Sequence, residues 1–307
     1  MSNTGPEIAT LSATRRGSAH GHPGSGVVLG LATAVGCAIG VWLTWRVFVD
    51  TAAGQRVDQA VYAGAHFGRN RLWHVAYPVL DLVSVPYIAG VLGAAVLIAV
   101  LRRRWAMAVQ VALLVGGANL TTRVLKTIVF SRPNLHATPL FSNALPSGHT
   151  TAAASVSAAL VFVVPPRARP WAAAFGALYT AATGVSTLVG GWHRPSDAVA
   201  GMLVVLAWSG LACALADWSQ SGAGSTPARR RRLPALGSGG GLLVLAGLGT
   251  ALPAAYSLRA SWMTVGALNS RAELLVAYAG GAFGVIAASA LAFAVLLFVR
   301  QSADRAV

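Results

Sequence analysis

The stretch from Lys126 to Asp197 contains three polar clusters, and each lies at the end of an apolar segment. The rest of the predicted fold is built around these clusters. The clusters read Lys126-Thr-Ile-Val-Phe-Ser-Arg132-Pro133, Pro146-Ser147-Gly148-His149 and Ser186-Thr-Leu-Val-Gly-Gly-Trp-His193-Arg-Pro-Ser-Asp197. Together they hold cations, two histidines and a carboxylate. Ionisable side chains are costly inside apolar helices and mark functional sites there. Their gathering at segment ends predicts one shared site.

The composition predicts an integral membrane protein. Charged residues make up 10% of the 307 residues, whereas roughly 25% is usual for soluble proteins. Hydrophobic residues make up 55% and the mean hydropathy is +0.63. The polar residues are too few to cover a surface that faces water.

The formal net charge of +15 comes from arginines that lie in short runs between apolar segments. This arrangement is typical of cytoplasmic loops under the positive-inside rule. It disfavours nucleic acid as a partner, because aromatic residues are not interleaved with the basic runs as they are in single-strand binders. The runs are Arg15-Arg16, Arg102–Arg104, Arg167 with Arg169, Arg229–Arg232, and Arg300 with Arg305.

The apolar segments predict an all-α polytopic transmembrane helical bundle with eight spans. Both ends of the chain then lie in the cytoplasm, and the three polar clusters share the opposite face. A polar stretch over 50–72 predicts an interfacial helix on that outer side. The expected spans are 26–49, 73–101, 105–130, 147–164, 171–189, 195–217, 241–255 and 274–299. Proline and glycines interrupt the seventh span, which leaves a re-entrant segment as an alternative.

The predicted domain organisation follows from these spans. A disordered cytoplasmic tail (1–25) precedes a six-span core (26–217). A basic cytoplasmic linker (218–240) then leads to a C-terminal transmembrane hairpin (241–299) and a short cytoplasmic tail (300–307). The two cysteines, Cys37 and Cys213, fall inside apolar segments and match no metal-binding spacing.

Lys126 is the only lysine in the sequence. Taken alone, it is an interfacial lysine whose amine reaches the headgroups. Arg132 and Pro133 follow it, and Arg123 lies three residues before it on the same helical face. These cations favour an anion-binding role for the first cluster.

Pro146-Ser147-Gly148-His149 stands where an apolar helix is expected to begin. A helix N-terminus offers free N–H groups and a partial positive charge, which together bind anions. Ser147 is able to cap the helix or to donate its hydroxyl to a phosphate oxygen. Gly148 lets the backbone approach an anion closely, and His149 would stand beside that anion as a proton donor or acceptor.

His193 and Asp197 are four positions apart at the start of the sixth span. On a helix this spacing brings a carboxylate within reach of an imidazole. The carboxylate would fix the tautomer and leave the other ring nitrogen as a nucleophile. Taken alone, such a pair is also an ordinary capping or surface pair.

The three clusters together resemble those of the type 2 phosphatidic acid phosphatase superfamily, membrane lipid phosphate phosphatases related to vanadium haloperoxidases. The resemblance covers residues 125–201 directly and extends by topology to the six-span core. It implies that His193 attacks phosphorus to form a phosphohistidine, that Asp197 orients His193, and that His149 protonates the leaving oxygen and then activates water.

The resemblance also implies a phosphate cradle made of Lys126, Arg132, Ser147 and the Gly148 backbone, with no metal or other cofactor. The third cluster departs from the family pattern, because Thr187 stands where an arginine is usual. Arg123 or Arg194 is the expected replacement. Five residues separate Lys126 from Arg132, one fewer than usual.

The expected function is therefore hydrolysis of a lipid phosphate or diphosphate, such as a polyprenyl phosphate or a phospholipid phosphomonoester. The site would face the extracytoplasmic side of a bacterial cytoplasmic membrane. Two alternatives stay open at this point. One is a phosphotransferase on the same fold, and the other is a non-catalytic protein that binds or transports a lipid phosphate. Residues 241–299 lie beyond the resemblance.

Overall fold

The computed structural model describes residues 25–81, 90, 93, 97, 103, 105–136, 143–221 and 237–304. Within these ranges the chain is helical and forms no strand, which confirms the all-α prediction. The helices are α1 (Ser25–Phe48), α2 (Ala52–Ala65), α3 (Arg69–Asp81), α5 (Trp105–Val124), the π-helix η1 (Leu125–Val129), α6 (Gly148–Val163), α7 (Arg169–Val189), α8 (Pro195–Ser221), α9 (Ser238–Met263) and α10 (Arg271–Asp304).

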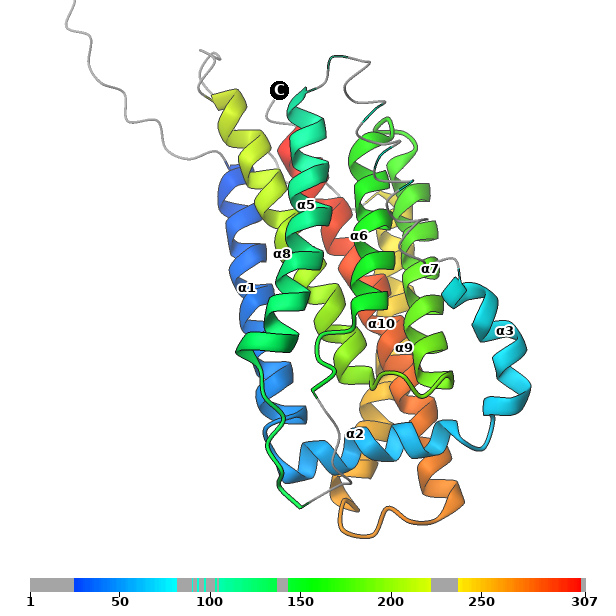
Figure 1. The fold of residues 1–307 in the computed structure, drawn as a ribbon. Coiled ribbons are helices and arrows are strands. Elements are labelled where there is room, and N and C mark those ends of the chain that lie inside the picture. The colour runs from blue at the N-terminus through cyan, green and yellow to red at the C-terminus, as the bar shows by residue number, and fades with distance from the viewer. Residues whose placement is uncertain are drawn as a thin grey trace, which may run out of the picture.

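Helices α1 and α5 to α10 run side by side as one bundle (Figure 1). Helix α2 lies across the lower end of this bundle, where an interfacial helix was predicted, and α3 stands beside α7. The end of α5 and the starts of α6 and α8 all point toward α2. The elements that carry the three polar clusters therefore meet at one end of the bundle, as the charge pattern predicted.

In the described part of the chain, six helices are long and apolar enough to cross a membrane. The protein is a membrane protein, and large apolar side chains such as Leu252 on α9 and Phe175 on α7 are well exposed on the outside of the bundle. The six spans are Gly26–Phe48, Trp105–Val129, Arg169–Val189, Pro195–Trp218, Ser238–Met263 and Arg271–Ala303.

Six of the eight predicted spans coincide with these helices in the described part of the chain. The other two predicted spans are 147–164 and 73–101. Helix α6 has 16 residues, or roughly 24 Å, which is shorter than the ~30 Å hydrocarbon core. Helix α6 begins at the polar cluster that contains Ser147. Residues of this cluster therefore occupy the depth that a further turn of apolar helix would fill. The predicted span 73–101 lies mostly outside the described residues. Its first part belongs to α3, which contains Pro78.

The C-terminal hairpin is longer than predicted. Helix α9 is continuous through Pro253, so the re-entrant alternative is wrong. Membrane helices tolerate proline where neighbouring groups satisfy the freed carbonyl. Helix α10 continues to Asp304, past the predicted boundary at residue 299. The predicted N-terminal tail and most of the predicted basic linker lie outside the described residues.

The bundle is held by one large apolar cluster between its central helices. Its fully buried members include Phe162 on α6, Leu114 on α5 and Leu297 on α10. At the end opposite the polar clusters, the Val27 amide at the start of α1 donates to Asp217 Oδ2 of α8 at 3.0 Å. The free N–H of one helix is thereby satisfied by the carboxylate of another.

Candidate active site

The centre of the site is a buried histidine–carboxylate pair at the start of α8. His193 Nδ1 lies 3.2 Å from Asp197 Oδ2, and both residues are buried. The same carboxylate oxygen accepts a hydrogen bond from the Arg194 amide at 2.9 Å. A proton on Nδ1 that is shared with Asp197 leaves the Nε2 lone pair of His193 free to act as a nucleophile.

Helix α6 is bound directly to this pair. The Ser147 amide donates to the Asp197 carbonyl oxygen at 2.8 Å, and the Ser147 hydroxyl accepts from the Thr150 amide at 3.3 Å as the N-cap of α6. A Cβ atom on Gly201 would lie 2.9 Å from Thr151 Oγ1. The absence of that atom lets α8 pack closely against the start of α6.

The first residues of α6 face open space and the other histidine. A Cβ atom built on Gly148 would meet no described atom within 4 Å, so the start of this helix leaves room for a ligand. The ring centroids of His149 and His193 lie 6.0 Å apart. Trp192 also packs against His149, with the ring centroids 5.2 Å apart. The two imidazoles therefore flank a space at a helix N-terminus, where an anion is favoured.

Lys126 and Arg132 approach this space from the end of α5. Lys126 lies in the π-helix η1, and the side-chain amide of Asn143 donates to its carbonyl oxygen at 3.2 Å. Lys126 is half-buried and interacts electrostatically with Asp197 and His149. Burial lowers the pKa of Arg132 and the charge of Arg194 lowers it further, while nearby carboxylates oppose the shift.

The two arginines expected to replace the missing one are placed differently. Arg123 is exposed on α5, and among the described residues it makes no hydrogen bond or ion pair with the histidine cluster. Arg194 is buried and points to α2, where its Nη2 donates to Gln59 Oε1 at 3.0 Å and its guanidinium lies 5.5 Å from the Tyr62 ring centroid. Thr187 is fully buried and its hydroxyl donates to the Gly184 carbonyl.

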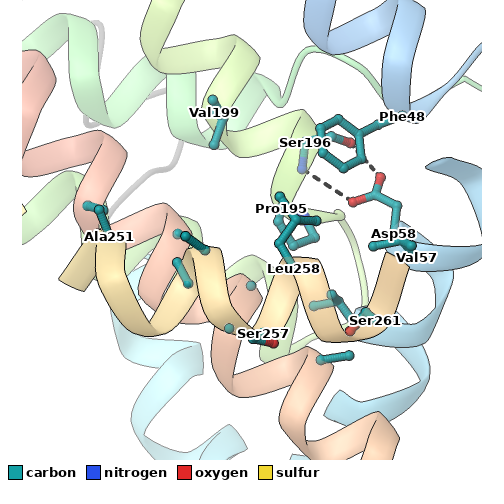
Figure 2. A pocket seen from close by; sticks show the side chains of 18 of the residues that line it. Phe48, Val57, Asp58, Pro195, Ser196, Val199, Ala251, Ser257, Leu258 and Ser261 are labelled. Carbon is teal, nitrogen blue, oxygen red and sulfur yellow. Dashed lines mark hydrogen bonds between the residues drawn. The ribbon is translucent and has the colours of Figure 1, made fainter. Parts of the chain in front are cut away.

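A second buried carboxylate, missed in the sequence, supports the start of α8 from α2. Asp58 accepts hydrogen bonds from the Ser196 hydroxyl and, at 3.5 Å, from the Ser196 amide, as Figure 2 shows. Burial raises the pKa of Asp58 to about 7, and the neighbouring charge of Asp197 adds to this effect. Its position on the inner face of a predicted interfacial helix was the only available signal.

Asp58 and Ser196 also stand at the edge of an apolar cavity of about 350 Å³ between α1, α2, α8, α9 and α10 (Figure 2). Small residues on α9 and α10, such as Ala254 and Gly284, line it. On α8 the lining residues are Pro195, Ser196 and Val199, whereas Asp197 and Gly201 face α6. The cavity is therefore separated from the histidines by the width of α8.

These features define a class: a membrane helical bundle with a histidine–carboxylate pair, a second histidine and cations at one end. Residues 104–221 match the sequence model of the PAP2 superfamily, a superfamily that includes lipid phosphatases. Helices α9 and α10 lie outside the matched segment. Searches of curated proteins and of solved structures gave no match.

Proposed function

We propose that this protein is a lipid phosphate phosphatase, which hydrolyses a terminal phosphate from a lipid monophosphate or diphosphate. Polyprenyl phosphates and phospholipid phosphomonoesters are the substrate classes expected. The observation that carries the proposal is the geometry at the start of α8: His193 is held by Asp197 at 3.2 Å, and His149 stands across an open space with its ring centroid 6.0 Å away.

The reaction would proceed in two steps. In the first, His193 Nε2 attacks phosphorus, the bond to the leaving oxygen breaks, and His149 gives its proton to that oxygen. In the second, His149 takes a proton from water and the water oxygen attacks phosphorus. The His193 Nε2–phosphorus bond breaks, and inorganic phosphate leaves. Asp197 stabilises the charge that develops on the His193 ring in the first step.

The phosphate oxygens would be held by positive charge and N–H groups. Lys126 and Arg132 supply the charge, Ser147 the hydroxyl, and Gly148 its backbone at the start of α6. Such donors stabilise the charge that develops on the transferred group in the transition state. We propose a metal-free reaction because these groups occupy the role that a cation plays in metal-dependent phosphatases.

The proposed location is the cytoplasmic membrane, with the site on the extracytoplasmic side. Arg167, Arg169 and Arg300 belong to the end of the bundle opposite the histidines, and arginine-rich ends favour the cytoplasm. A site at the membrane surface suits a substrate whose headgroup is in water and whose tail stays in lipid.

Phosphate release by the purified protein in detergent tests this proposal, on a panel of lipid phosphates with and without chelator. We expect release that His193→Ala lowers by at least about a thousandfold, whereas His66→Ala, an exposed histidine at the end of α2, leaves it unchanged. Equal rates for His193→Ala and the unaltered protein would refute the enzyme assignment. Loss of activity in chelator would refute the metal-free mechanism.

A further inference from the structure

An arginine from outside the matched segment lies against the third polar cluster. Arg69, the first residue of α3, donates from its Nε to the Val189 carbonyl oxygen at 3.1 Å. Its Nη2 packs against Gly191 so closely that a Cβ atom on that glycine would lie 2.0 Å away. Gly191 has φ +67°, so glycine fits both the backbone conformation and the contact with Arg69.

A cavity of about 440 Å³ opens beside this arginine. Besides Arg69, the residues that line it are Asn70, Trp73, Gly190 and Trp192. Trp73 packs edge-on against Trp192, with centroids 5.9 Å apart, and Trp192 packs in turn against the His149 ring at 5.2 Å. Trp192 therefore stands between the cavity and His149.

The guanidinium of Arg69 has one buried nitrogen, Nη2, whose hydrogen bonding is not satisfied by the described residues. Its Nη2 is buried and has no hydrogen-bond partner among the residues that the structure describes. Buried donors are nearly always satisfied in functional proteins, by protein, water or ligand. The third cluster lacks its usual arginine at Thr187, so Arg69 brings a guanidinium to the same cluster from a distant part of the chain.

We propose that Arg69, with Trp73 and Trp192, forms a second anion subsite that binds the phosphate retained by a lipid diphosphate. The proposal rests on the function proposed above, in which His149 protonates the leaving oxygen. The group attached to that oxygen must then lie on the His149 side of the site, which is the side of this cavity. In a lipid diphosphate that group is a second phosphate.

The reaction on a diphosphate balances as follows. The His193 Nε2–phosphorus bond forms at the terminal phosphate, and the bond from that phosphorus to the bridging oxygen breaks. The bridging oxygen receives the proton of His149 and leaves as part of a lipid monophosphate, held by Arg69 through charge-assisted hydrogen bonds. A monophosphate substrate has only its alkyl group there, so Arg69 makes the enzyme prefer diphosphates.

A purely structural role for Arg69 predicts a different result. The Nε bond to Val189 places a cation at the C-terminal end of α7, where it stabilises the helix. Loss of that contact would disturb the end of α7 and lower turnover of every substrate to a similar extent. The ratio of activities on matched diphosphate and monophosphate substrates separates the two roles.

The test compares kcat/KM for the monophosphate and the diphosphate of one short isoprenoid alcohol. We expect Arg69→Ala to lower the value for the diphosphate about ten- to hundredfold and that for the monophosphate by less than about threefold. Arg71→Ala removes the same charge from an exposed position of α3 and should change neither. Equal losses on both substrates, or no loss on the diphosphate, would overturn the proposal. Arg69→Lys carries the same comparison if Arg69→Ala does not fold.

A binding measurement keeps this proposal separate from the proposed function. In the His193→Ala protein, the non-hydrolysable methylene diphosphonate of the same alcohol should bind at least about tenfold more tightly than its phosphonate, and Arg69→Ala should remove that difference. If the unaltered protein hydrolyses neither substrate, the phosphatase assignment fails while the subsite is still judged by binding. Equal binding of the two analogues refutes the subsite.

Discussion

Asp58→Asn should change how the stability of the protein depends on pH. The pKa of Asp58 in the folded protein is about 7, against an ordinary value of 3.8. Between these two values the folded protein holds a proton that the unfolded chain has already lost. The stability that the protonated carboxyl provides is therefore fully present below pH 3.8 and is lost as the pH rises to 7.

The magnitude follows from that window. Each pH unit within it costs about 1.4 kcal/mol of unfolding free energy, which amounts to roughly 3 kcal/mol between pH 5 and pH 7. Asparagine does not ionise, and its Oδ1 still accepts a hydrogen bond from Ser196. The stability of Asp58→Asn relative to the unaltered protein should therefore rise by roughly 3 kcal/mol from pH 5 to pH 8.

The assay is denaturant unfolding in detergent micelles at pH 5, 6, 7 and 8, followed by circular dichroism. Ser196→Ala is the matched control, because it removes a hydrogen bond that favours the ionised form of Asp58. It should raise the pKa of Asp58 further and extend the loss of stability to higher pH, with the same slope per pH unit. Parallel pH profiles for the unaltered protein and Asp58→Asn would refute the reasoning, since Asp58 would then titrate alike in the folded and unfolded states.

Four further substitutions have defined outcomes. Asp197→Asn should lower kcat for phosphate release by about a hundredfold or more with little change in KM, because the carboxylate acts on the charged imidazole of the transition state; a normal kcat would contradict this role. Gly201→Ala should cost about 1–3 kcal/mol of unfolding free energy, because its Cβ would lie 2.9 Å from Thr151 Oγ1. Gly148→Ala should leave the unfolding midpoint nearly unchanged but lower phosphate release, because its methyl group enters the proposed anion space, and unchanged release would place the phosphate elsewhere. Ala255→Leu should raise the unfolding midpoint by filling the apolar cavity behind α8, and a lower midpoint would show that the cavity cannot accept the side chain.

Much of the fold was predictable because it depends on local patterns. The span of α1 over Gly26–Phe48 follows from one apolar run, and the start of α8 at Pro195 follows from a proline in the first turn. The structure confirms the all-α bundle and one common end for the three clusters. The length of α6 was not predictable, because it depends on where Ser147 joins the site.

The contacts of the candidate site were predictable where the two residues are close in sequence. His193 and Asp197 meet because four positions make one helical turn. The position of Arg69 against the third cluster was not predictable, because α3 lies far away in the chain from that cluster. Sequence reasoning proposed Arg123 and Arg194, whereas the structure exposes the first and points the second to α2.

The sequence by itself determined that this chain enters a membrane as helices and that its polar clusters share one end. Apolar runs and arginine placement carry that information, because water and lipid act on each segment separately. Only the tertiary structure decided which distant groups support the site. Asp58 bonds to Ser196, 138 positions away, and Arg69 bonds to Val189, 120 positions away. Such contacts arise when α2 and α3 pack against the starts and ends of other helices, and no local pattern encodes that packing.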